Sequence, residues 1–128
     1  LEAVTREDTA VDTDPSGEDF RTAQTGVARA EVGLANYGTI SIESRAGGDE
    51  LVSLYPPRHV VVLDAADIVP DLAAAFDRFE SAIRDARESG GAGASRVLAT
   101  GPSATADMGE LVEGVHGPKE VHVLVVEQ

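Results

Sequence analysis

Two short apolar runs rich in β-branched residues, HVVVL at 59–63 and VHVLVV at 121–126, constrain the fold most. A strand that is apolar on both sides needs cover on both faces of its sheet, which parallel sheets in α/β proteins provide. Both runs are therefore predicted to be interior strands, with His122 as the single polar residue of the second run. Four further short strands are expected, at 32–35, 39–43, 51–54 and 96–100.

The clearest helix is predicted over PDLAAAFDRFESAIRDARES, residues 70–89. Its large apolar residues recur at spacings of four and three, which places them on one stripe of a helix. That stripe consists of Leu72, Phe76, Phe79, Ile83 and Ala86. Pro70 suits the first turn of a helix, and Gly90 suits its end. One long helix between short strands predicts an α/β sandwich with a largely parallel sheet.

The length of 128 residues indicates one domain. Residues 1–19 are acidic and contain a Pro-Ser-Gly turn signal, so this segment is expected to be mobile or at most a short helix. Residues 20–128 are expected to form the single α/β domain. Its first residues, 20–30, are expected to be a weak helix or a lead-in to the domain. No apolar run is long enough to span a membrane, and the first residues do not resemble a signal peptide. The protein is expected to be cytoplasmic.

The charge is strongly negative, at −13, and Lys119 is the single lysine beside nine arginines. Such a surface repels nucleic acid, because binding it requires neutralisation of phosphates. Self-repulsion of this size destabilises a compact chain at low salt, and salt of about 1 M screens it. The composition therefore predicts adaptation to a salt-rich cytoplasm, as in halophilic microbes. The alternative is a protein that is simply acidic.

Cysteine is absent from the sequence. The chain therefore has no disulfide, no thiolate zinc site, no cysteine nucleophile and no iron–sulfur cluster held by its own thiolates. The three histidines are dispersed and lack the close spacing with carboxylates that zinc sites show, which is a weak pattern for zinc. We expect no cofactor and no metal held by this chain. His59 and His122 lie in predicted strands and are interpreted as structural.

The loop TGPSATADMGELVEGV, residues 100–115, is the first candidate site. Met108, Leu111, Val112 and Val115 have helical spacing, so a helix is predicted there, with Ser103 or Thr105 as its cap and Asp107 near its positive end. Ligands in open α/β sheets bind beyond the carboxyl ends of strands, where helix N-termini offer free N–H groups. This loop is a possible cradle for a phosphate or a carboxylate. Alternatively, its residues only cap the helix and turn the chain.

The loop GVHGP, residues 114–118, is the second candidate site. Its flanking glycines, Gly114 and Gly117, let the backbone approach a ligand or a neighbouring strand closely. His116 is suited to acid–base chemistry or to hydrogen bonding with an anion near neutral pH. The alternative is a loop histidine that bonds to nearby backbone.

Taken together, TGPSATAD, GVHGPKEVHV, VGLANYGTISIES and SLYPPRHVVVL resemble the LUD-domain family, the lactate utilisation protein C group, over about residues 26–127. The resemblance implies a Rossmann-like α/β sandwich similar to the NagB/RpiA/CoA-transferase-like group. It also implies a role in oxidising L-lactate to pyruvate with two partner proteins, at least one of them an iron–sulfur protein. The family's motif positions correspond here to Gly101, Pro102, Ser103, Thr105, Ala106, Asp107, Gly114, His116, Gly117, Pro118, Gly38 and Thr39.

This chain departs from the family pattern at two places. Asn36 and Tyr37 occupy a turn in which relatives often have a glutamate, and Ala104 replaces a larger polar or basic residue. A catalytic carboxylate and one anion contact are therefore in question.

Three functions remain open. The first is an accessory subunit that binds an anionic metabolite through Gly101, Ser103, Thr105 and His116. The second is an assembly protein that docks an iron–sulfur partner and has no small-molecule site. The third is an enzyme of the sugar-phosphate isomerase or CoA-transferase kind, for which Glu43, Asp107 and His116 are weak catalytic candidates.

Overall fold

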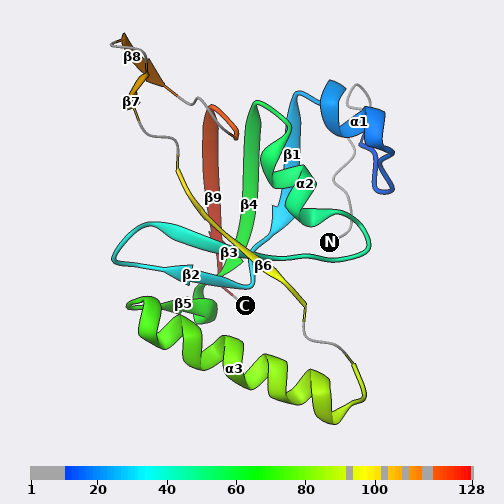
Figure 1. The fold of residues 1–128 in the computed structure, drawn as a ribbon, viewed down its shortest axis with the longest axis vertical. Helices are drawn as coiled ribbons and strands as arrows, with labels where there is room; N and C mark the ends of the chain where they lie inside the picture. Colours follow the sequence, from blue (N-terminus) through cyan, green and yellow to red (C-terminus); the bar gives the residue numbers. More distant parts are fainter. Residues whose placement is uncertain (1–10, 92–93, 102–103, 108–109, 114–116, 128) are drawn as a thin grey trace.

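The computed structural model describes residues 11–91, 94–101, 104–107, 110–113 and 117–127 (Figure 1). Its helices are α1 (Gly17–Thr22), α2 (Asp49–Leu54), the 3₁₀ turn η1 (Ala65–Asp67) and α3 (Leu72–Glu88). Its strands are β1 (Thr25–Arg29), β2 (Val32–Leu34), β3 (Thr39–Glu43), β4 (Arg58–Asp64), β5 (Ile68–Val69), β6 (Arg96–Thr100), β7 (Ala104–Asp107), β8 (Glu110–Glu113) and β9 (Glu120–Val126). The mixed α/β class predicted from the sequence is confirmed.

The first sheet has the order β1-β4-β9 and is parallel throughout. α2 packs on β1 across one face of this sheet (Figure 1). The approach is close at Gly26, because a Cβ at this position would collide with the carbonyl oxygen of Val52. Glycine in β1 is therefore a packing requirement.

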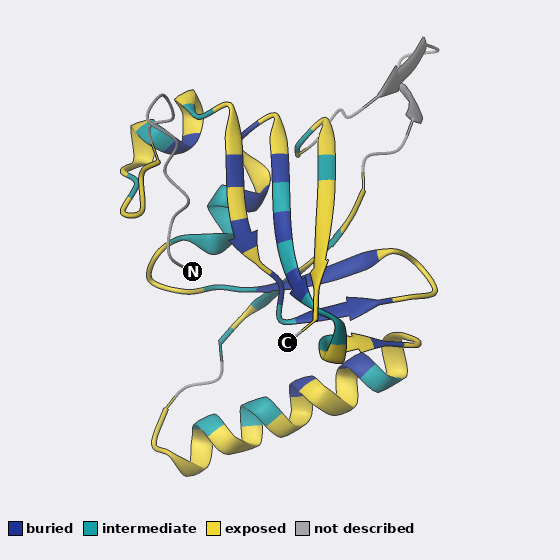
Figure 2. Ribbon diagram, turned by 180° about the vertical axis from the view of Figure 1, so that it is seen from behind, coloured by how far each residue is buried: buried dark blue, intermediate teal, exposed yellow. Residues whose placement is uncertain are grey.

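The second sheet has the order β5-β2-β3-β6. β3 is antiparallel to β2 and β6, whereas β5 is parallel to β2. The sheet lies between the carboxyl ends of β1 and β4 on one side and α3 on the other (Figures 1 and 2). The parallel arrangement expected from the apolar runs thus describes the first sheet, and a mainly antiparallel sheet accompanies it.

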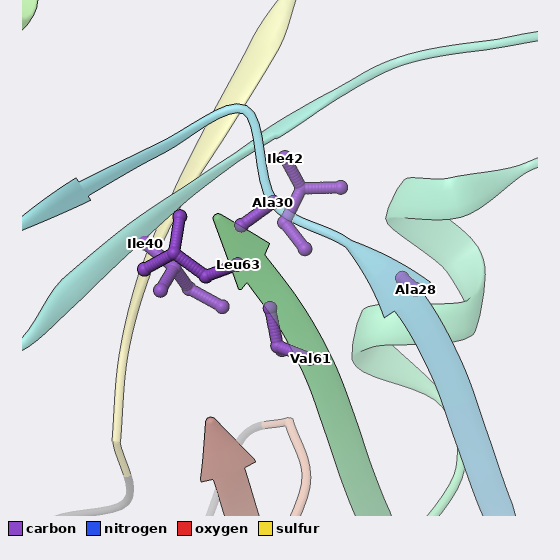
Figure 3. Packing of buried hydrophobic residues seen from close by; sticks show 6 residues of the cluster. All are labelled: Ala28, Ala30, Ile40, Ile42, Val61 and Leu63. Atoms are coloured by element: carbon purple, nitrogen blue, oxygen red, sulfur yellow. The ribbon is translucent and has the colours of Figure 1, made fainter. Parts of the chain in front are cut away.

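The core has two parts, one on each face of the second sheet. Ala28, Ala30, Ile40, Ile42, Val61 and Leu63 form the cluster between the two sheets (Figure 3). Val32, Leu34, Val69, Ala75 and Phe79 form the cluster between the second sheet and α3. Aliphatic side chains fill both parts except for Phe79 in the second, as expected for a chain with 4% aromatic residues.

The predicted helix at 70–89 is confirmed as α3. It begins at a different residue than expected, and the face that it buries is rotated from the predicted apolar stripe. Asp71 caps it by accepting a hydrogen bond from the Ala74 N–H at 2.9 Å, so Pro70 lies outside the helix. Phe76 was expected on the buried stripe and is 56% exposed, whereas Ala75 and Phe79 are buried. The small Ala75 side chain lets α3 approach the sheet closely, which spacing of the large residues alone did not reveal.

Two local predictions are wrong. Residues 51–54 belong to α2 and not to a strand; the helix begins after Gly48, whose φ of 75° suits glycine. Residues 20–30 contain the end of α1 and all of β1. A run of four apolar residues such as LVSL does not distinguish a buried helical turn from a strand.

The helix predicted near residues 105–115 is also wrong, because β7 and β8 form an antiparallel pair in which Ala104 faces Glu113 and Asp107 faces Glu110. The two connecting residues, Met108 and Gly109, lie outside the described part of the chain. A two-residue connection with glycine second is a hairpin signal, and it outweighed the helical spacing of the apolar residues.

The interior position predicted for residues 121–126 is wrong as well. Among the strands that the structure describes, β9 pairs with β4 alone and lies at the edge of the parallel sheet. Val123, Leu124, Val125 and Val126 are between 37% and 52% exposed (Figure 2). The strand is therefore correct, and its place in the sheet is not.

Candidate functional site

The two predicted loops both adjoin the base of the β7–β8 hairpin. Gly101 directly follows β6, and Gly117 and Pro118 lie before β9, from which Lys119 separates them. The pair Ala104 and Glu113 closes the base of the hairpin between these loops, and the hairpin extends away from the two sheets (Figure 1). Ser103, Gly114 and His116 lie outside the described residues, so their expected convergence stays a prediction.

The helical part of the expected cradle is absent from 104–107, because Thr105 and Asp107 lie in β7. The hairpin therefore offers an anion no cluster of N–H groups at a helix N-terminus. Anion binding here would therefore depend on hydroxyl groups and on loop backbone. The loop before β9 also lies at the amino end of this parallel strand, whereas ligands of open α/β sheets usually bind at carboxyl ends.

The turn at Gly38 and the loop at Gly101 are brought together by the pairing of β3 with β6. Thr39 faces Thr100 in the register of the two strands, and their Oγ1 atoms are 2.8 Å apart. Gly38 has a φ of 60°, and a Cβ at either Gly38 or Gly101 would meet open space. Thr39 is buried and Thr100 is exposed. Thr100 completes this cluster, and sequence reasoning missed it because only long-range strand pairing places it beside Thr39.

Glu43 lies apart from this cluster. It ends β3 and faces Arg96, four residues along the strand from Thr39, which corresponds to roughly 13 Å at the usual rise of a strand. Its carboxylate is 3.7 Å from the guanidinium of Arg45. The structure therefore does not bring Glu43 together with Thr39 and Gly101.

His59 and His122 lie in β4 and β9, in agreement with their interpretation as strand residues. His59 is fully buried, and neither ring nitrogen has a hydrogen-bond partner among the described residues. Burial lowers the pKa of His59 to about 4, because the charged form loses its hydration. The His122 Nε2 lies 3.3 Å from the Glu120 carboxylate at the surface.

The carboxylate of Glu120 also accepts a hydrogen bond from the Nε of Arg58 at 2.8 Å. Hydrogen bonds from Arg58 and His122 lower the pKa of Glu120.

Within the described ranges, no group of three or more His, Asp or Glu side chains could hold a metal ion. No helix in the same ranges has the length and apolar character needed to cross a membrane.

A family model of the LUD domain matches residues 2–126, almost the entire chain. The chain belongs to the LUD-domain family. The resemblance seen in the sequence motifs is thereby confirmed.

Curated relatives of this LUD domain include three bacterial proteins named Lactate utilization protein C. The Bacillus licheniformis protein is 35% identical over 107 residues, which cover 82% of this chain and 43% of the relative. The Bacillus velezensis protein is 33% identical over 107 residues, covering 80% and 42%. The Bacillus subtilis protein is 33% identical over 120 residues, covering 89% and 48%. The LUD domain described here thus spans less than half the length of these relatives.

The fold of this LUD domain is similar to the crystal structure of a DUF162 family protein from Deinococcus radiodurans. The TM-score is 0.63 at 23% sequence identity, and the match covers 89% of this chain and 59% of that chain. This likeness supports the Rossmann-like α/β fold.

Proposed function

We propose that this LUD domain is an accessory, anion-binding subunit in the oxidation of L-lactate to pyruvate. The observation that carries the proposal is its match to relatives named Lactate utilization protein C, together with the LUD-domain match over residues 2–126. Because the matched part spans less than half the length of these relatives, the proposal concerns the contribution of this domain and leaves room for other parts of such a system.

The proposed binding region is the cluster of Thr39, Thr100 and Gly101, extended by Ser103 and Thr105 along the chain. When one threonine hydroxyl donates to the other across 2.8 Å, the accepting hydroxyl keeps its own hydrogen for an external acceptor. The open space at Gly101 lets a carboxylate approach the backbone. His116 and Asp107 remain candidates for accepting the proton of the substrate hydroxyl.

An iron–sulfur partner supplies the electron acceptor that this chain lacks. Oxidation of L-lactate to pyruvate releases two electrons and two protons, and the electrons need an acceptor. The chain has no cysteine, so it cannot hold a thiolate-bound cluster itself. An iron–sulfur protein bound to this domain would accept the electrons.

The test is ligand-induced thermal stabilisation in high salt with L-lactate and pyruvate as probes. A ligand present at 100 times its dissociation constant is expected to add roughly 2.7 kcal/mol to the free energy of unfolding. The double variant Ser103→Ala with Thr105→Ala is expected to lose most of this stabilisation, and so is Thr39→Val. Thr22→Ala is the control, because its exposed hydroxyl bonds to the Glu18 carbonyl oxygen within α1.

Unchanged affinity in both hydroxyl variants would refute the proposed binding region. Stabilisation lost equally in Thr22→Ala would show that the effect does not come from these hydroxyl groups.

A second candidate function, assembly, is favoured by the exposed apolar side chains of β9. Val123, Leu124 and Val125 are 41%, 52% and 52% exposed on an edge strand. Exposed apolar surface of this kind commonly marks a protein–protein interface. Anaerobic co-purification of an iron–sulfur protein, without any effect of lactate or pyruvate on stability, would favour assembly over anion binding.

A further inference from the structure

A polar cleft separates the β1–β2 connection from α3, with a cavity volume of about 680 Å³. The aliphatic residues Ala30, Val32 and Ala82 are also among those that line it. None of its residues belongs to the loops at 101–107 and 114–118. The volume lies within the range of small-molecule pockets, roughly 300–1,000 Å³.

The basic side chains of this cleft differ in how far their charges are already engaged. Arg78 donates to the Asp67 carboxylate at 2.9 Å and to the Ala66 carbonyl oxygen at 3.0 Å, so its guanidinium is occupied. Arg45 makes looser contacts, at 3.7 Å to Glu43 and 3.5 Å to Asp49. Arg29 has no ion pair within 4.0 Å among the described residues. Positive charge is therefore available on the strand side of the cleft.

The acidic side chains differ in the same way. Glu31 is held by Arg96 in a two-point contact at 2.6 and 2.8 Å. Asp77 and Asp85 are on α3, and the described part of the chain contains no cation within 4.0 Å of either carboxylate. Ser81 lies between them on the helix and donates its hydroxyl hydrogen to the Asp77 carbonyl oxygen at 3.0 Å, so its oxygen can still accept. Negative charge is therefore available on the helix side.

A cleft with available cations on one side and available carboxylates on the other matches a ligand that carries both charges. A guanidinium binds a carboxylate through two parallel N–H···O bonds. An ammonium group has three donors and no acceptor, which suits Asp77 and the Ser81 oxygen one turn further on. Asp85 lies eight residues from Asp77, about 12 Å along the helix axis, and is too far away to share the same ammonium group. The aliphatic lining residues suit an apolar side chain.

We propose that this cleft binds a small zwitterion, an α-amino acid with an apolar side chain. Arg29 and Arg45 hold its carboxylate, and Asp77 holds its ammonium group together with the Ser81 oxygen. A 2-hydroxy acid satisfies the arginines but leaves the Asp77 carboxylate without a cation. The site is separate from the proposed lactate region, so either one can fail without the other.

The test compares three probes with one carbon skeleton: L-leucine, L-2-hydroxy-4-methylpentanoate and 4-methylpentanoate. They differ at carbon 2, which carries an ammonium group, a hydroxyl group or hydrogen. Calorimetric titration of the complete chain is expected to show saturable binding of L-leucine, at least about tenfold tighter than either acid, because charge-assisted hydrogen bonds are lost with the ammonium group. Arg29→Ala and Asp77→Asn are each expected to weaken L-leucine binding by about tenfold or more.

The matched controls are Arg87→Ala and Asp14→Asn, which change the same charges outside the cleft. Both are expected to leave L-leucine binding unchanged. The proposal is overturned if L-leucine does not bind saturably, if the hydroxy acid binds as tightly as L-leucine, or if the controls weaken binding as much as the cleft variants. Circular dichroism spectra of every variant separate a loss of binding from a loss of folding, and Arg29→Lys, which keeps the positive charge, is expected to retain more of the affinity than Arg29→Ala.

Discussion

β4 and β9 are adjacent in the parallel sheet and have similar sequences, RHVVVLD and EVHVLVV, but β4 is buried and β9 is exposed. Val61 in β4 is 0% exposed, whereas its register partner Val123 is 41% exposed. Leu63 is 3% exposed and its partner Val125 is 52% exposed. β4 pairs on both sides and packs on the second sheet, whereas β9 pairs on one side only within the described part of the chain. The residue composition of a segment favours a strand, and the position of that strand in the sheet decides whether other elements cover it.

The largest expected difference between the strands is in large-to-small substitution. Leu63→Ala should lower the free energy of unfolding by about 3 kcal/mol, because it leaves a cavity between the two sheets. Val125→Ala removes methyl groups that are already half exposed and should cost less than about 1 kcal/mol. Urea unfolding in high salt measures both values. Equal losses would break the comparison, because they would mean that β9 is covered in solution.

The second difference concerns the histidines of the two strands. The pKa of His59 is about 4, against 6.5 for an ordinary histidine. The unfolded chain therefore takes up a proton on this ring at a higher pH than the folded protein does. Stability is fully retained above about pH 6.5 and is lost as the pH falls toward 4, by about 3 kcal/mol in total.

His59→Leu tests this expectation, because leucine fills the space without buried nitrogen atoms that lack partners. The variant should be at least as stable as the parent at pH 7.5 and should lose less stability between pH 6.5 and 4. His122→Gln on the exposed strand should retain the contribution of His59. A pH profile unaltered by His59→Leu would contradict the assignment.

The smallest expected difference is between two ion pairs. Arg96 and Glu31 have side chains that are 11% and 21% exposed, and the Arg96 guanidinium lies 5.2 Å from the centroid of the Phe79 ring. Arg58 and Glu120 join β4 to β9, and both are 50% exposed. Arg96→Ala should lower the free energy of unfolding by about 2 kcal/mol, because the Glu31 carboxylate loses its two charge-assisted hydrogen bonds. Arg58→Ala should have a small effect that disappears in high salt, because exposed pairs are screened.

Unfolding measurements at low and high salt distinguish the two pairs. A large, salt-independent loss in Arg58→Ala would show that the edge of the sheet is less exposed to solvent than the structure indicates.

Local patterns predicted the elements whose signals are long or strongly alternating. The strands at 39–43 and 96–100 and the helix α3 follow from periodicity and from their Gly and Asp boundaries. Short segments failed where two structures suit the same letters: LVSL became helical, and the residues after Ala104 became a hairpin. Which structure such a segment adopts depends on tertiary packing, and local propensity carries no information about that packing.

The candidate sites show the same limit. Gly38, Thr39 and Gly101 were expected from their motifs, but the contact between Thr39 and Thr100 arises from pairing across 61 positions of the chain. The cleft at Arg29 was not expected, because its residues come from β1, from the loop after β3 and from α3. None of these arginines or aspartates belongs to a recognisable motif.

The sequence by itself determined the strands and the long helix, the absence of thiolate chemistry and the membership of the LUD-domain family, because these depend on local periodicity, residue type and motif. Only the tertiary structure decided that β9 lies at an edge, that Thr100 lies beside Thr39 and that Arg29 and Asp77 line one cleft. The order of strands in a sheet and the meeting of distant side chains in one site depend on contacts between residues that are far apart in the sequence. The pattern of a short segment does not contain these contacts.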